Sequence, residues 1–125
     1  MAGCNAAPKQ VAVGLAAAQA ADAIGNMLVP SSFLTSHLDR LGVPSRLQPA
    51  LPFIKLAGSA GLVLGIKAPR VGAVAAACLV GYYSAAVAFH ALADDHAVAW
   101  VPAIAFGATA AASLVRFYLP AITAA

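Results

Sequence analysis

Three ionisable residues lie inside segments that are otherwise apolar enough to cross a membrane. Asp22 lies in the first such segment, Lys55 in the second and His90 near the end of the third. Charge inside hydrocarbon is costly and persists where it is paired or used, so these residues are the first candidates for a functional site. Their chemistry would be ion pairing, proton exchange or hydrogen bonding to the polar head of a lipophilic ligand.

Asp22 belongs to a polar stripe on the first apolar segment. Gln19, Asp22 and Asn26 are spaced three and four residues apart, so they share one helix face, which should turn toward the interior of a bundle. Asp22 lies about 10 Å from the outer end of its segment by helix rise, too deep for its short side chain to reach water. Lys55 either pairs inward with Asp22 or extends its long side chain to the outer interface.

His90 follows Tyr83 by seven residues, so both side chains fall on the same face of the third segment. One interpretation places His90 at the membrane interface. The other places it level with Lys55, in the outer half of the bundle. Because histidine is the residue type that titrates near neutral pH, it would then form a gate between outside water and the pair of Asp22 and Lys55. A purely structural alternative is a buried ion pair that fixes helix register.

Composition assigns the chain to the membrane class. Hydrophobic residues make up 62% of the 125 residues and charged residues 9%, against about 25% charged residues in soluble domains. The mean hydropathy is +0.88. The formal net charge of +3 is small, and no basic cluster or RNA-binding motif indicates a nucleic-acid partner.

Hydropathy predicts an all-α integral membrane protein, a four-helix up-down bundle that forms a single domain over residues 1–125. The predicted spans cover residues 11–29, 50–66, 71–92 and 98–119. Pro52 and Pro102 are expected in the first turns of the second and fourth spans, where a missing N–H is tolerated.

The polar connection 31–49 contains a predicted amphipathic helix at the membrane interface, with an ordinary loop as the alternative. The apolar residues of this helix fall on one face: Phe33, Leu34, Leu38 and Leu41.

Basic residues predict the orientation. One side of the predicted bundle collects Lys9, Lys67, Arg70 and Arg116, and the other has Arg40 and Arg46 beside three aspartates. The side richer in Lys and Arg is expected to be cytoplasmic, together with both termini. Trp100 and Tyr118, near opposite ends of the fourth span, are expected to anchor at the two interfaces.

Other chemistries find no support in the sequence. The three histidines lack metal-ligand spacing, the two cysteines lie too far apart for a dithiol, and no nucleotide-binding glycine pattern occurs. No metal and no cofactor are therefore predicted, and whether the protein is an enzyme stays open. Gly61 and Gly65 form a GxxxG motif that indicates close helix packing.

Several short motifs resemble the DoxX-like family of small four-span bacterial membrane proteins. They are Leu41-Gly42-Val43-Pro44, Pro52-Phe53-Ile54-Lys55-Leu56-Ala57-Gly58, Gly61-Leu62-Val63-Leu64-Gly65 and Phe89-His90 before an acidic turn. The resemblance covers roughly residues 10–118. It implies a multi-pass protein of the bacterial inner membrane and, by analogy with a quinone-linked thiosulfate oxidoreductase subunit, an association with respiratory or redox complexes.

Two functional hypotheses follow. In the first, the protein is a membrane subunit or small enzyme that binds a quinone-like or other lipophilic molecule in the outer half of the bundle, through Lys55, His90 and Tyr83. In the second, it is a non-enzymatic packing module in a membrane complex, and Asp22 and Lys55 only lock its helices. The bilayer is the expected partner in both, with other membrane subunits or further copies of the chain as additional partners. A cavity lined by Asp22, Lys55 and His90 would favour the first hypothesis.

Overall fold

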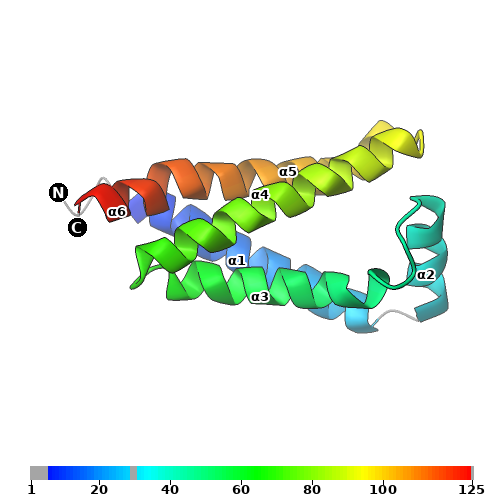
Figure 1. Cartoon of the computed structure of the whole chain (residues 1–125), viewed down its shortest axis with the longest axis horizontal. Helices are drawn as coiled ribbons and strands as arrows, with labels where there is room; N and C mark the ends of the chain where they lie inside the picture. Colours follow the sequence, from blue (N-terminus) through cyan, green and yellow to red (C-terminus); the bar gives the residue numbers. More distant parts are fainter. Residues whose placement is uncertain (1–5, 29–30, 125) are drawn as a thin grey trace.

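The structure, a computed structural model, describes residues 6–28 and 31–124, and these form helices without a strand (Figure 1). The long helices are α1 (Ala6–Leu28), α3 (Leu51–Leu64), α4 (Pro69–Leu92) and α5 (Ala97–Ser113). The shorter elements are α2 (Ser31–Arg40), the 3-10 turn η2 (Gln48–Ala50), the π-helical stretch η3 (Leu114–Tyr118) and α6 (Leu119–Ala124). The predicted all-α fold is confirmed.

The long helices pack as a ring. α1 lies against α3 and α5, and α4 lies against the same two helices. Consecutive long helices run in opposite directions, and α6 continues from α5 to the end of the molecule where α1 begins (Figure 1). Toward the opposite end the pair α4 and α5 diverges from the pair α1 and α3, and α2 lies there (Figure 1). This divergence decides where a ligand could enter.

Three helical segments of the described chain are long and apolar enough to cross a membrane: Ala7–Leu28, Pro69–Leu92 and Val98–Ala124. The helix within the predicted second span, α3, has 14 residues and is about 21 Å long by helix rise. The hydrocarbon core is about 30 Å thick, so a full crossing at residues 50–66 stays a prediction. The end of the predicted first span, at residue 29, lies outside the described residues.

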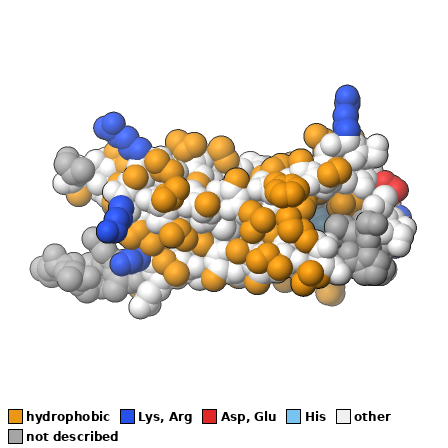
Figure 2. Space-filling model, turned by 90° about the horizontal axis from the view of Figure 1, so that it is seen from below, with side chains coloured by type: hydrophobic (Ala, Val, Ile, Leu, Met, Phe, Trp, Pro, Cys, Tyr) orange, Lys and Arg blue, Asp and Glu red, His pale blue; other side chains and the backbone are white. Residues whose placement is uncertain are grey.

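Charge gathers at the two ends of the molecule. Lys and Arg side chains lie at both ends of the molecule, acidic side chains are visible at one of these ends, and hydrophobic side chains dominate the surface between them (Figure 2). This distribution fits a molecule whose middle lies in hydrocarbon. The direction in which it crosses the bilayer stays a prediction.

Glycines close the seam between α3 and α4. A Cβ added to Gly58 would meet the Leu79 side chain at 2.6 Å, and one added to Gly61 would meet the Cβ of Ala75 at 2.6 Å. The GxxxG motif is therefore used inside the chain for close helix packing, as predicted.

Tyr118 is not an interfacial anchor, and that prediction is wrong. Its side chain is buried against Gly72, and its hydroxyl donates to the carbonyl of Leu62 at 2.6 Å. The π-helical stretch η3 adds a residue to the turn and so changes which side chains face inward. Leu62 is near the end of α3, where carbonyls lack helical partners, and Tyr118 supplies one.

Pro102 also departs from the prediction. α5 begins at Ala97, so Pro102 is the sixth residue of the helix and lies beyond its first turn. Its missing N–H leaves the carbonyl of Val98 without the usual helical donor. Pro52, by contrast, occupies the first turn of α3 as expected.

The predicted helix of the polar connection is present as α2. Leu38 and Leu41 line a cavity at the divergent end of the bundle, and the position of this helix at a membrane interface stays a prediction. The side chains of Phe33 and Leu34 lie outside the described part of the structure. An amphipathic pattern is expected both for a helix that packs against protein and for one that lies on lipid.

Candidate functional site

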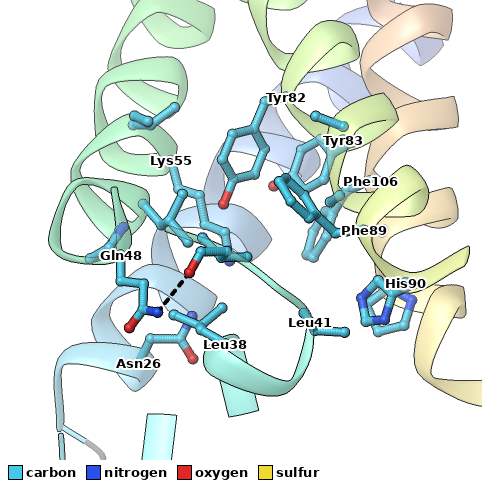
Figure 3. Close-up of a pocket in the computed structure, with 18 of the residues that line it drawn as sticks. Asn26, Leu38, Leu41, Gln48, Lys55, Tyr82, Tyr83, Phe89, His90 and Phe106 are labelled. Carbon is cyan, nitrogen blue, oxygen red and sulfur yellow. Dashed lines mark hydrogen bonds between the residues drawn. The ribbon is translucent and has the colours of Figure 1, made fainter. Parts of the chain in front are cut away.

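A cavity of about 430 Å³ lies where the two helix pairs diverge. It is bounded by α1, α3, α4 and α5, and by α2 with the connection that follows it. Its polar lining consists of Asp22, Asn26, His37, Gln48, Lys55, Tyr82, Tyr83 and His90, and its aromatic side includes Phe89 and Phe106 (Figure 3). Its volume falls in the range of about 300–1,000 Å³ typical of small-molecule sites.

Gln48 holds the connection against the cavity. Its side-chain amide donates to Asp39 Oδ1 at 2.8 Å and to the carbonyl of Val43 at 3.0 Å. These bonds fold the segment after α2 back toward the start of α3. Leu41 and Leu38 are thereby placed over the opening between the helix pairs (Figure 3).

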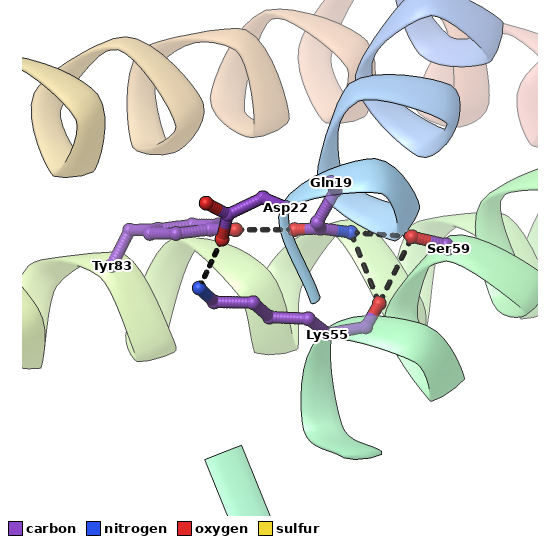
Figure 4. Close-up of polar contacts among 5 residues, drawn as sticks. All are labelled: Gln19, Asp22, Lys55, Ser59 and Tyr83. Carbon is purple, nitrogen blue, oxygen red and sulfur yellow. Dashed lines mark hydrogen bonds and ion pairs between the residues drawn. The ribbon is translucent and has the colours of Figure 1, made fainter. Parts of the chain in front are cut away.

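Lys55 and Asp22 form an ion pair inside the bundle (Figure 4). The Lys55 side chain is 14% exposed and the Asp22 side chain 40% exposed. Both residues line the cavity. Of the two fates considered for Lys55, the structure shows the inward pairing.

A buried hydrogen-bond network lies behind this pair (Figure 4). The hydroxyl of Tyr83 donates to Gln19 Oε1 at 2.6 Å, and Gln19 Nε2 donates to Ser59 Oγ at 3.0 Å. The same Nε2 approaches the carbonyl of Lys55 at 3.3 Å, and Ser59 Oγ donates to that carbonyl at 2.9 Å. The network ties α1, α3 and α4 together at one level of the bundle.

Aromatic rings form one wall of the cavity. Tyr82 meets Tyr83 edge-on with ring centroids 4.9 Å apart, and Tyr83 stacks on Phe106 at 5.3 Å with an interplanar angle of 24°. Such contacts favour rigid ring positions. The wall therefore offers a preformed surface to a flat ligand.

His90 lies at the mouth of the cavity, away from the ion pair. Its Nδ1 donates to Asp95 Oδ2 at 2.9 Å, and its ring centroid is 6.5 Å from that of His37 on α2. Asp95 Oδ1 also accepts from the His96 backbone N–H at 2.9 Å. These hydrogen bonds lower the pKa of the Asp95 carboxyl below its usual value, the bond from His90 having the largest effect.

The structure brings most of the predicted site residues to one cavity. Asp22, Asn26, Lys55, Tyr83 and His90 line it. Gln19 does not line it but is fully buried behind the ion pair. His90 lines the cavity but pairs with Asp95, and no ion pair or hydrogen bond joins it to Lys55 within the described residues.

Tyr82 and His37 also line the cavity, and they are not among the site residues predicted from the sequence. Tyr82 could have been found, because Tyr82, Ala86 and Phe89 recur at the four- and three-residue spacing of one helix face. No signal identifies His37, because its position depends on how the connection folds back.

The chemistry available here is binding rather than metal ligation. No group of three or more metal-ligating side chains occurs in the described part of the chain. The cavity instead combines an aromatic wall, an ammonium beside a carboxylate, and an imidazole at the mouth. Such a site can hold a flat, largely apolar molecule by its polar end.

Helix lengths, surface charge and this cavity define a small helical membrane protein with an amphipathic cavity between its helices. Residues 10–113 match the model of the DoxX-like family, so the chain belongs to that family. No curated protein and no solved structure is similar enough to match. The resemblance inferred from short motifs is thereby confirmed.

Proposed function

We propose that this protein binds a lipophilic, quinone-like molecule in the cavity and acts as a membrane component of a redox-associated assembly. The observation that carries the proposal is the joining of an aromatic wall to the polar groups of Lys55, Tyr82 and His90 in one cavity. A planar ring with polar substituents matches that lining. The redox association rests on the family analogy alone.

The position of the cavity also supports the proposal. It lies between helices whose outer surfaces are apolar, so a ligand dissolved in the bilayer meets the site without crossing water. His90 lines the cavity, and its partner Asp95 lies in the turn between α4 and α5. They are suited to exchange protons between a bound ligand and the aqueous side.

The packing-module alternative has its own support. The network of Gln19, Ser59 and Tyr83 is buried and satisfied, and it would fix helix register even with the cavity empty. A test must therefore separate binding from folding.

The test uses the protein in lipid nanodiscs and the quenching of its single tryptophan, Trp100, by 2,3-dimethyl-1,4-naphthoquinone. This quinone carries no free ring position for addition of the exposed thiol of Cys78. Trp100 follows the cavity residue Ala99 directly, so a bound quinone will quench its emission. We expect saturable quenching.

Two variants of α4 make the assay specific. Ala86→Leu fills part of the cavity, whereas Ala88→Leu adds the same atoms on the exposed side of the helix. We expect Ala86→Leu to weaken quenching and Ala88→Leu to match the parent. Absence of saturable quenching in the parent, or equal quenching in both variants, would leave the packing module as the better account. Mass spectrometry of lipids and proteins that co-purify in mild detergent tests the redox association.

A further inference from the structure

We infer that Tyr82 and Lys55 together bind one carbonyl oxygen of the ligand, so that the site selects a neutral carbonyl compound over a carboxylate. This inference rests on the proposed function and names the chemistry of the ligand head. It assigns ligand binding to Tyr82 and an internal hydrogen bond with Gln19 to its neighbour Tyr83.

The two tyrosines differ in what their hydroxyls do. The Tyr83 hydroxyl is committed to Gln19 at 2.6 Å, and the side chain is 3% exposed. No hydrogen bond from the Tyr82 hydroxyl to another described residue is formed, and because no buried polar side-chain atom in the described part lacks a partner, this hydroxyl is accessible at the cavity that Tyr82 lines. Figure 3 shows it pointing into the cavity on the side where Lys55 lies. A hydroxyl in that position is available as a donor to a ligand.

Lys55 supplies the second donor. Its ammonium has three N–H bonds, and its only side-chain partner in the described chain is Asp22. At least one N–H therefore remains for a ligand oxygen. A carbonyl oxygen has two lone pairs and can accept from the ammonium and from a phenol together.

Charge decides between ligand classes. The Asp22 carboxylate neutralises Lys55, its side chain is 40% exposed, and it lines the cavity. A carboxylate ligand would bring a second negative charge beside it in a medium of low dielectric. A neutral carbonyl meets the same donors without that repulsion. The lining therefore favours a quinone-like ketone over a fatty acid, although both are lipophilic molecules with acceptor oxygens.

The rest of the lining fits a planar ketone. Tyr82 stands edge-on to Tyr83, which stacks on Phe106, so the aromatic wall begins directly beside the two donors. A ring carbonyl lies in the plane of its ring. The ring can therefore pack along this wall while its oxygen reaches Tyr82 and Lys55.

The experiment compares three single-hydroxyl deletions in α4, each measured with 2,3-dimethyl-1,4-naphthoquinone in nanodiscs. Tyr82→Phe should weaken binding by about two- to ten-fold, the usual value of one hydrogen bond, with an unchanged Tm. Tyr83→Phe should lower the Tm, because Gln19 loses a buried donor. Ser84→Ala removes an exposed hydroxyl bonded to the carbonyl of Val80 and should change neither.

Competition with the bound quinone tests the ligand class. 2,3-Dimethylnaphthalene lacks the oxygens, and 3-methyl-2-naphthoic acid carries a carboxylate. Both should compete poorly in the parent. The loss on Tyr82→Phe should be absent for the hydrocarbon, which cannot accept the hydrogen bond.

Failure of this inference is distinct from failure of the proposed function. If the parent binds the quinone and Tyr82→Phe binds it equally well, or if the acid competes as strongly as the quinone itself, the assignment is wrong while quinone binding stands. If the parent does not bind the quinone, both fall together.

Discussion

Breaking the ion pair of Asp22 and Lys55 should lower the free energy of unfolding more when the carboxylate is removed than when the ammonium is removed. The asymmetry follows from exposure, because the Lys55 side chain is 14% exposed and the Asp22 side chain 40% exposed. Asp22→Leu leaves an ammonium that is almost enclosed. Lys55→Met leaves a carboxylate whose side chain keeps more of its surface accessible.

The magnitudes follow from those two environments. Removing one partner of a buried pair costs about 3–5 kcal/mol in soluble proteins. We expect about 3 kcal/mol for Asp22→Leu, near the lower bound because the cavity relieves part of the penalty. For Lys55→Met we expect about 1 kcal/mol, since the remaining group is more than a third exposed. The double variant should also lose about 1 kcal/mol, because no charge is stranded.

The assay is reversible unfolding in mixed micelles by titration with SDS, followed by circular dichroism. The two single losses should exceed the double loss by about 3 kcal/mol. If the losses add to within about 0.5 kcal/mol, the two charges do not interact. If Lys55→Met is the more damaging variant, the exposure argument is wrong.

Three further outcomes are expected. Gly72→Ala should destabilise by about 2 kcal/mol, because its Cβ would collide with an aromatic ring; Gly81→Ala, with open space around it, should instead raise the Tm. The stabilising contact of Asp95 with His90 should be complete above the ordinary aspartate pKa of about 3.9 and lost as the pH falls through its lowered pKa. Asp95→Asn should abolish that acid dependence of amide exchange in the turn. In a variant without the native cysteines, Lys67→Cys should react with impermeant reagents only from the cytoplasmic side. Labelling of this cysteine in intact cells would show that the protein has the opposite orientation.

Hydropathy predicted the helices because burial of apolar residues in lipid leaves few alternatives. The same cost of burying charge predicted that Lys55 and Asp22 could meet. Neither argument depends on the angles at which the helices cross. The helices and the ion pair could therefore be predicted without knowledge of the packing. The polar stripe of Gln19, Asp22 and Asn26 also turned inward, for the same reason.

The sequence could not predict details that depend on local register or on contacts distant in the chain. Tyr118 is buried because a π-helical stretch changes the face on which it lies, and no sequence period reports such a turn. The roles of Tyr82 and Tyr83 differ by one residue, about 100° around a helix. Only the position of Gln19 shows which of the two hydroxyls forms a hydrogen bond within the protein.

The order of residues along α3 explains why the molecule has a cavity at one end and a closed seam at the other. Lys55 lies near the start of the helix, and Gly58, Gly61 and Gly65 follow it. The glycines let α4 approach closely over the later turns. Around Lys55 the polar side chains and the aromatic rings of α4 hold the helices apart, and the chain closes the gap with α2. Substitutions in the glycine seam should therefore change stability, and those in the first turns of α3 should change binding. Such a division would give a small membrane protein freedom to alter its ligand without losing its fold.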